Sequence, residues 1–315
     1  MSEYHRPVML QEAISYLSIK DNGIYVDATL GGGGHSAAIL RANPSVRLYS
    51  FDRDEEAIRY NHPLEEEFKD RCKIFNDNFV NIRTRLALER ISRIDGILFD
   101  LGVSYSQIST SARGMSFILD GHLDMRMNQN DELTAYEVVN NYSVQELATI
   151  IRDFGEEREA FRIAQGIENY RRIRPIETTL ELGEVIERSI RSAYKIKAKA
   201  RVFQGIRIYI NGELEALKSA LYDAVELLNP LGRIVVISYH SLEDRIVKQI
   251  LVNEEKECIC PTQFPKCICD KKKRLKIITK KPLRPTTDEI RENRQARSAK
   301  MRVAESTSEL TGGRE

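Results

Sequence analysis

The amino-acid sequence predicts an α/β protein in which a doubly wound, mostly parallel sheet is interrupted by an inserted all-helical domain. Three observations support this fold class. Residues 1–106 alternate between apolar runs typical of strands and amphipathic stretches typical of helices. Residues 107–202 keep helical periodicity but lose the strand pattern. Strand-like runs return in residues 203–315, so we expect both flanking parts to build one sheet.

The first part, residues 1–106, predicts four strands separated by helices. Alternation of this kind indicates parallel strands joined by right-handed crossovers. The expected strands lie near 24–28, 47–52, 72–76 and 95–100, and the expected helices cover 9–17, 36–42, 54–60 and 79–90.

The inserted part contains three stretches with helical periodicity, "SVQELATIIRDFG", "REAFRIAQGIENYRR" and "TTLELGEVIERSIRSAY". Ser143 and either Thr178 or Thr179 are suitable N-cap residues for two of these helices. Residues 203–315 continue with a helical stretch, "NGELEALKSALYDAVELLNP". They then predict a buried strand in "GRIVVISYHS", two more strands in "LKIIT" and "SAKMRVAE", and a basic C-terminal tail.

The glycine-rich stretch "DATLGGGGHS" (residues 27–36) connects a predicted strand with a predicted helix, which is typical of a nucleotide site. Glycines allow sharp turns and close ligand approach because no Cβ intervenes. A phosphate-binding P-loop ends in Lys and Ser/Thr, whereas this loop ends in His35 and Ser36 with no Lys, so that class is excluded. Gly32, Gly34 and Ala37 match the dinucleotide fingerprint, and Asp52 is a plausible following acid. The pattern alone leaves two candidates, a dinucleotide or another adenosine ligand.

Acidic residues end three of the predicted strands, and their charge separates these candidates. Asp27, Asp52 and Asp100 follow the apolar runs "IYV", "LYSF" and "GILF". In a doubly wound sheet the carboxyl ends of the strands meet at the ligand crevice. Carboxylates there repel a pyrophosphate but attract the sulfonium and ammonium groups of S-adenosylmethionine. The sequence therefore favours a methyl donor over a hydride donor.

Composition limits which binding partners and which cellular location we expect for the protein. The chain has 315 residues, 42% hydrophobic content and a net charge of +1, which fits one large domain or two. Three basic runs (171–175, 195–201 and 270–285) nevertheless offer local sites for nucleic acid. No apolar run approaches the roughly 18 residues of a membrane span, and the N-terminal residues lack a signal-peptide pattern. We therefore expect a cytoplasmic protein with no membrane partner.

Five cysteines occur in the chain. Cys72 lies in a predicted strand and should be a core residue. The other four form two C-x-C pairs around a Pro-containing hairpin, "CICPTQFPKCIC". In a reducing compartment this arrangement favours a metal over disulfides, and four thiolates suit tetrahedral zinc. The candidate zinc ligands are Cys258, Cys260, Cys267 and Cys269; the alternative is a loop of reduced thiols.

Several stretches follow one another along nearly the whole chain in an order typical of one family: "GIYVDATLGGGGHS", "FDRDEEAI", "DGILFDLGVS", "FQGIRIYINGELEAL" and "ISYHSLEDRIVK". On these stretches the sequence closely resembles the bacterial MraW/RsmH family, S-adenosylmethionine-dependent methyltransferases that modify a cytosine N4 in 16S rRNA. The resemblance implies a class I methyltransferase (Rossmann-like) sheet and an inserted domain, residues 107–202, that recognises RNA. It also implies that the substrate is one cytosine in the decoding centre of small-subunit rRNA.

The same resemblance implies which residues bind the methyl donor. Asp52 would accept hydrogen bonds from the ribose hydroxyls, and Phe79 would pack against the adenine. The four cysteines are not universal in the family, so zinc would be an accessory feature. By matching motif, the donor-binding residues are Gly33, Gly34, His35, Asp52, Phe79, Asp100 and Gln107.

Methylation of a cytosine amine makes particular demands on the site. The amine is a weak nucleophile, so positioning is the main task, and an acceptor for its N–H directs the lone pair toward the methyl group. Asp100 should be that acceptor, or else bind only the donor. His240 could contact RNA or donor, or bridge backbone groups. The target base must leave its stack, and Tyr105, Phe117 or Tyr239 could stack on it.

Two other function classes stay open at this point. A NAD-dependent oxidoreductase would use the glycine loop for a dinucleotide, although the strand-end acids disfavour its pyrophosphate. A noncatalytic rRNA-binding assembly factor would bind RNA without methyl transfer, and the glycine loop with its three acids argues against it.

Overall fold

The computed structural model of the protein describes residues 7–261, 264 and 266–307 and divides into two compact units. Met1–Gly102 and Leu214–Glu315 form the first unit, and Val103–Glu213 form the second. We predicted an insertion of residues 107–202, and the second unit extends beyond this range at both ends. The C-terminal difference arises because α11 (Lys195–Asn211) is one uninterrupted helix, which our boundary divided.

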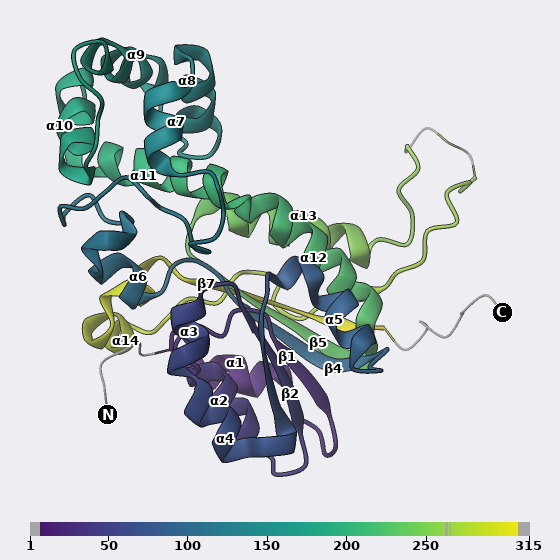
Figure 1. The fold of residues 1–315 in the computed structure, drawn as a ribbon. Helices are drawn as coiled ribbons and strands as arrows, with labels where there is room; N and C mark the ends of the chain where they lie inside the picture. The colour runs from purple at the N-terminus through teal and green to yellow at the C-terminus, as the bar shows by residue number, and fades with distance from the viewer. Residues whose placement is uncertain (1–6, 262–263, 265, 308–315) are drawn as a thin grey trace. The chain divides into compact units, whose positions relative to one another are not determined.

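The first unit is built on a seven-stranded sheet with the order β3-β2-β1-β4-β5-β7-β6 (Figure 1). Five of its strands are parallel: β1 (Ile24–Asp27), β2 (Arg47–Asp52), β3 (Cys72–Asn76), β4 (Ile94–Asp100) and β5 (Leu228–Ser238). β7 (Lys300–Ser306) runs antiparallel to both β5 and β6 (Leu275–Ile277). The predicted doubly wound, mostly parallel sheet is thereby confirmed, and both ends of the chain contribute to it.

Helices cover both faces of this sheet. They are α1 (Leu10–Leu17), α2 (Gly34–Ala42), α3 (Glu55–Tyr60), α4 (His62–Phe68), α5 (Ile82–Leu88), α12 (Glu213–Leu227) and α13 (Ser241–Glu255); the short helix α14 (Thr287–Glu292) buries none of its residues. We missed α4 because its sequence, "HPLEEEF", is short and mostly polar, and it buries only Phe68.

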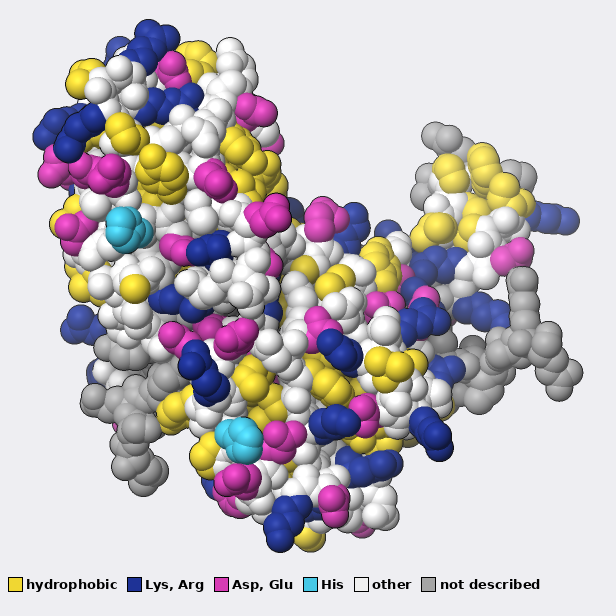
Figure 2. All heavy atoms as spheres, viewed as in Figure 1, with side chains coloured by type: hydrophobic (Ala, Val, Ile, Leu, Met, Phe, Trp, Pro, Cys, Tyr) yellow, Lys and Arg dark blue, Asp and Glu magenta, His cyan; other side chains and the backbone are white. Residues whose placement is uncertain are grey.

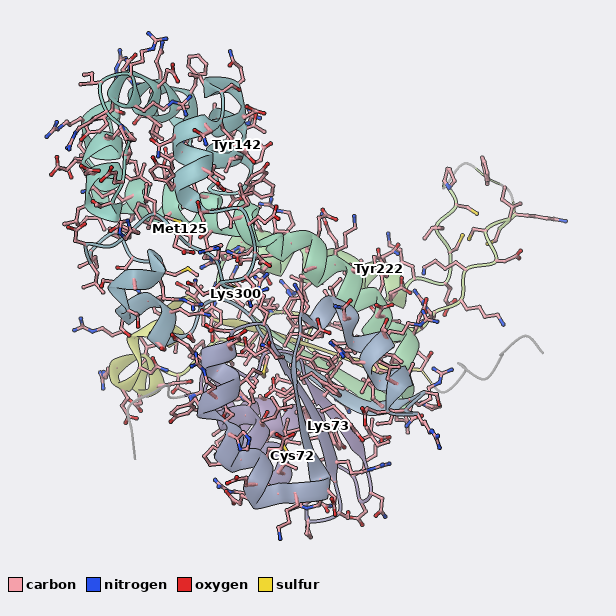
Figure 3. The ribbon with its side chains drawn as sticks, in the orientation of Figure 1. Cys72, Lys73, Met125, Tyr142, Tyr222 and Lys300 are labelled. Carbon is pink, nitrogen blue, oxygen red and sulfur yellow. The ribbon has the colours of Figure 1, made fainter. Side chains whose placement is uncertain are left out.

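Two hydrophobic cores lie on the opposite faces of the sheet, because successive side chains of a strand point to opposite sides. Ile97 and Phe99 of β4 pack into the core that contains α5, α12 and α13. Leu98, between them, packs into the core that contains α1 and α2. Cys72 of β3 is buried in this second core, as predicted (Figure 3). The strands are therefore anchored on both sides, which holds their carboxyl ends in fixed positions.

The second unit contains helices and no strand of the sheet. Its α-helices are α6 (Tyr105–Ser109), α7 (Ala135–Asn141), α8 (Val144–Asp153), α9 (Ala160–Arg171), α10 (Thr179–Ser189) and α11. Ser143 and Thr178 cap α8 and α10 in capping boxes, as their sequence positions predicted. Tyr142, labelled in Figure 3, packs edge-on against Tyr209 of α11 at a centroid distance of 5.9 Å.

Among the described residues, no helix has both the length and the apolar character needed to cross a membrane.

Candidate active site

The glycine loop joins β1 to α2 and has a backbone that only glycine fits at Gly33. This residue has φ +74°, and a Cβ added there would lie 1.9 Å from Oδ1 of Asn61. The Asn61 amide donates to the carbonyl of Gly31 at 2.8 Å, which holds the turn from behind. Asn61 lies between α3 and α4, where no sequence motif indicated a role. The loop is thus a rigid turn that opens onto the first residues of α2.

Asp27, the first of the three strand-end acids, is fully buried beneath this loop. Its carboxylate accepts hydrogen bonds from the Ser36 hydroxyl at 2.7 Å and from the Thr29 amide at 3.1 Å. Burial raises the pKa of Asp27 above its usual value. Asp27 therefore connects β1 to α2 and is fully buried, whereas we had expected all three acids to line the ligand crevice.

Asp52, at the end of β2, supports the loop from the neighbouring strand. Its Oδ2 accepts from the amide of Gly31 at 2.8 Å, and its Oδ1 accepts from the amide of Asp54 at 2.9 Å. A carboxylate offers about four acceptor positions, so two remain for a ligand. Burial raises the pKa of Asp52 to about 6. The group is therefore mostly a charged acceptor at neutral pH, and protonation in mild acid removes its charge and part of its acceptor capacity.

Asp100, at the end of β4, is the centre of a cluster of polar side chains that come from three other segments. Its Oδ1 accepts from the hydroxyl of Tyr239, which follows β5, at 2.7 Å. Its Oδ2 lies 3.4 Å from Nε2 of His35, at the start of α2. Its backbone amide donates to the Thr29 hydroxyl at 2.6 Å. The carboxylate of Asp100 is consequently fixed in orientation, with 10% of its side chain exposed.

The pKa values of both partners of Asp100 are shifted by burial and by the neighbouring carboxylates. Burial alone would lower the pKa of His35, but the carboxylates of Asp100 and Asp27 outweigh burial and raise it. Neither ring nitrogen of His35 has a hydrogen bond of good geometry among the described residues. Burial, together with the Asp100 charge, raises the pKa of Tyr239 well above its ordinary value. We had considered Tyr239 only as a stacking residue, and no sequence signal indicated its bond to Asp100.

Phe79 begins a 3₁₀ turn after β3 and is partly buried. Its ring packs edge-on against Phe99 of β4 at a centroid distance of 5.9 Å. The backbone at this point is tied to β2, because the amide of Asp77 donates to the carbonyl of Asp52 at 2.9 Å. Phe79 thus lies at the same carboxyl edge of the sheet as Asp52.

Gln107, the last predicted donor-binding residue, belongs to the second unit. Its side-chain oxygen accepts from the amide of Ser104 at 3.1 Å, and the Ser104 hydroxyl accepts from the amide of Gln107. These two bonds form the capping box of α6. The side chain of Gln107 therefore stabilises the start of this helix.

Two of the remaining candidates have structural contacts. Nδ1 of His240 accepts a hydrogen bond from the amide of Glu243 and caps α13. This contact corresponds to the structural alternative for His240, in which the side chain bridges backbone groups. Phe117 packs edge-on against Phe203 within the second unit. The side chain of Tyr105 lies outside the described residues.

The basic runs of the second unit are largely compensated by acidic partners. In the run 171–175, each arginine has a carboxylate partner, at 2.5 to 3.1 Å. In the run 195–201, Lys199 pairs with Glu187 at 2.5 Å and Arg201 pairs with Glu157 at 3.2 Å. The Lys195 ammonium donates to two backbone carbonyls. Both runs thus contribute to the structure of the helical unit.

The four cysteine thiols of the loop after α13 converge in space. All four Sγ atoms lie within 4.8 Å of one another. Three Sγ pairs are 3.5, 3.8 and 4.0 Å apart, close to the roughly 3.8 Å edge of a tetrahedron with 2.3 Å zinc–sulfur bonds. Backbone amides of Ile259 and Lys271 lower the pKa of the Cys269 thiol to about 6, which favours its thiolate. This donor set suits zinc chemically.

Known proteins similar to this chain match it over almost its full length. The sequence profile of the MraW methylase family matches residues 2–307. A protein of Carboxydothermus hydrogenoformans is 49% identical over 306 residues, covering 96% of this chain and 98% of its own. A protein of Caldicellulosiruptor saccharolyticus is 49% identical over 305 residues, with the same coverage. A protein of Finegoldia magna is 45% identical over 305 residues, also with the same coverage. All three are named ribosomal RNA small subunit methyltransferase H.

Proposed function

The chain belongs to the MraW methylase family, and we propose that it transfers a methyl group from S-adenosylmethionine to the exocyclic N4 amine of a cytosine in 16S rRNA. The observation that carries this proposal is the Asp100 cluster, in which His35 and Tyr239 hold one carboxylate beside the glycine loop. The target cytosine lies in the decoding centre of the small ribosomal subunit.

The residues around the glycine loop fit the methyl donor. The N-terminus of α2 begins at Gly34, directly after the glycine loop, and a helix N-terminus attracts a carboxylate such as that of the methyl donor. Gly33 and Gly34 let the backbone approach the ligand closely. Asp52 has two acceptor positions for the ribose hydroxyls, and Phe79, at the same edge of the sheet, would pack against the adenine. Gln107 completes the proposed donor-binding set.

Asp100 is the proposed catalytic residue. Its carboxylate accepts a hydrogen bond from one N–H of the cytosine amine, which directs the nitrogen lone pair toward the methyl group. The same carboxylate would accept the proton that the nitrogen releases as it gains the methyl group. When bound, S-adenosylmethionine supplies an electrophilic methyl group on a sulfonium sulfur. His35 and Tyr239 stabilise negative charge on Asp100 and fix its direction.

The helical unit, Val103–Glu213, recognises the RNA in this proposal, while the first unit holds the donor. Because the run 195–201 is largely paired, the test must use a residue without such a role. Lys197 lies over the Tyr194 ring, 5.1 Å from its centroid, and this pair has the charge and aromatic face that bind RNA. Lys197→Ala with Tyr194→Ala should weaken RNA binding and leave donor binding unchanged. Equal RNA affinity in the double variant and the unmodified protein would contradict this role.

The cysteine loop binds one zinc ion as an accessory structural site. Two observations support this assignment. The Sγ atoms of Cys258, Cys260, Cys267 and Cys269 converge, and backbone amides donate hydrogen bonds to the sulfurs of Cys260 and Cys269. Since a closed four-thiolate site leaves no open coordination position, the metal takes no part in methyl transfer.

Methyl transfer to rRNA tests the proposed function directly. Naked 16S rRNA and assembled small subunits are incubated with labelled S-adenosylmethionine, and the product nucleosides are identified by mass. We expect N4-methylcytosine at a single position of the 16S rRNA, in the decoding centre. Binding of RNA without any methylated product would indicate an assembly factor, and binding of NAD in place of the donor would indicate an oxidoreductase.

A further inference from the structure

The third basic run, in the first unit, differs from the two runs of the helical unit because most of its charge is uncompensated. Between residues 271 and 284 the sequence contains eight lysines and arginines and no acidic residue. Lys271 and Arg274 pair with the buried carboxylate of Glu254 at 3.2 and 2.6 Å. Five further side chains are exposed and have no carboxylate partner within the described part of the chain: Lys272, Lys276, Lys280, Lys281 and Arg284.

The backbone that carries these cations is held on two sides. The Arg274 amide donates to the carbonyl of Glu254, the last buried residue of α13, at 2.9 Å. The Ile277 amide donates to the carboxylate of Glu255 at 2.8 Å. On the opposite side, the amide and hydroxyl of Thr307 donate to the carbonyl of Arg274. Since the chain is ordered before any ligand arrives, binding there costs little further conformational entropy.

The strand registers show how far the basic run lies from Asp100. Asp100 of β4 is aligned with Ile237 of β5, and Ile237 is aligned with Met301 of β7. Met301 in turn forms a bridge with Leu283. Leu283 therefore lies three strand spacings, about 14 Å, from Asp100 along one line across the sheet. The run begins at the reactive edge with Lys280, Lys281 and Arg284, and β6 continues it along the outer edge of the sheet.

The far end of the run meets the cysteine loop. Figure 1 shows an extended segment that follows α13, and Figure 2 shows dark blue Lys and Arg side chains at its base. Ile259 and Ile268 of the loop are exposed by 55% and 71%, so its surface is partly apolar. A basic stem beneath an exposed apolar loop suits a partner that carries both phosphates and flat apolar surfaces.

We propose that residues 272–284 form a basic track that binds the phosphate backbone of the substrate RNA next to the methylation site. This inference rests on the proposed function and adds a second RNA contact, on the unit that holds the donor. Phosphates within about four stacked nucleotides of the target base would reach the track, because the stacked rise is about 3.4 Å per nucleotide.

The test compares two triple variants of the full chain. Lys276→Ala, Lys280→Ala and Lys281→Ala remove three charges from the track. Lys69→Ala, Lys218→Ala and Lys248→Ala remove three exposed lysines from elsewhere in the first unit and serve as the matched control. The affinity for 16S rRNA fragments is measured from low to moderate salt, together with the thermal stability of each variant.

We expect the track variant to lower the slope of log affinity against log salt by about 2 to 3, since each lost phosphate contact contributes about 0.7 to 0.9. The control variant should change the slope by less than the contribution of one phosphate contact. The difference should disappear on RNA fragments that end within about two nucleotides of the target cytosine. The donor affinity and the single-turnover rate at saturating RNA should match those of the unmodified protein.

Lysines on an edge strand can also serve only to prevent pairing with another sheet, and this alternative has a different outcome. If the track variant keeps the salt slope of the unmodified protein and instead self-associates, the track is a protected edge and the inference is wrong. Failure of the proposed function is a separate result, because it would appear as absent methyl transfer by the unmodified protein.

Discussion

Tyr239→Phe removes one hydroxyl from the Asp100 cluster while the ring that packs over Gly102 stays in place. The lost bond, 2.7 Å from Oη to Oδ1 of Asp100, is a hydrogen bond to a charged group, worth about 1.5–3 kcal/mol. If its contribution is made fully in the transition state, the rate should fall about 10- to 150-fold, at 1.36 kcal/mol per factor of ten. Tyr239 is thus predicted to be a positioning residue that acts through Asp100.

The assay is single-turnover methyl transfer at saturating S-adenosylmethionine and saturating RNA, with separate measurement of donor affinity. We expect the rate of Tyr239→Phe to fall by the stated factor and its donor affinity to change less than about threefold. Asp100→Asn should also lose rate at saturating donor. In the Asp100→Asn background, Tyr239→Phe should cause little further loss, because the two residues act as one unit.

Three results would refute this reasoning. A Tyr239→Phe rate within twofold of the unmodified protein would mean that the hydroxyl has no part in orienting Asp100. Recovery of a near-normal rate by Asp100→Asn at saturating donor would mean that Asp100 only binds the donor. Equal losses from Tyr239→Phe in both backgrounds would assign the effect to packing instead of the hydrogen bond.

Three further predictions concern the donor site and the metal. Because Asp52 has a pKa of about 6 and binds the ribose as a carboxylate, donor affinity should weaken as the pH falls from 7.5 to 5, whereas Asp52→Asn should bind weakly and without this pH dependence in calorimetry. In Gly33→Ala the added Cβ would lie 1.9 Å from Asn61, at a residue with a positive φ. Chemical denaturation should therefore show a larger loss of folding free energy than the roughly 1–2 kcal/mol expected for Gly212→Ala, where φ is also positive but no atom lies near the added Cβ. Equal losses in the two variants would show that the loop relaxes freely. Elemental analysis of protein purified without chelator should find one zinc per chain and about none in Cys267→Ser, and four free thiols with no metal in the unmodified protein would contradict the site.

The sequence alone determined the fold class and the position of the donor loop. Strand and helix periodicities are local, so a few neighbouring residues suffice to predict β1 to β5 and the helices of the insertion. The glycine loop and the acids that end the strands are also local features. Since the carboxyl ends of parallel strands meet at one edge, it followed that Asp52 and Asp100 would lie at the same edge of the sheet.

Tertiary structure alone decided which side chains act on one another there. Asp100 and Tyr239 are 139 positions apart, and their bond depends on the register of β4 against β5. Asn61 supports the glycine loop from a segment without any motif. Asp27, similar to Asp52 in sequence context, is fully buried because Ser36 and the Thr29 amide satisfy its carboxylate.

The three basic runs illustrate the same distinction for charge. In sequence they look alike, and each offered a candidate RNA site. In the folded chain the two runs of the helical unit find acidic partners, whereas most of residues 272–284 lies along the edge of the sheet without them. Composition counts charges, but only packing determines whether a charge already has a partner, because the partner comes from a segment that the local sequence does not contain.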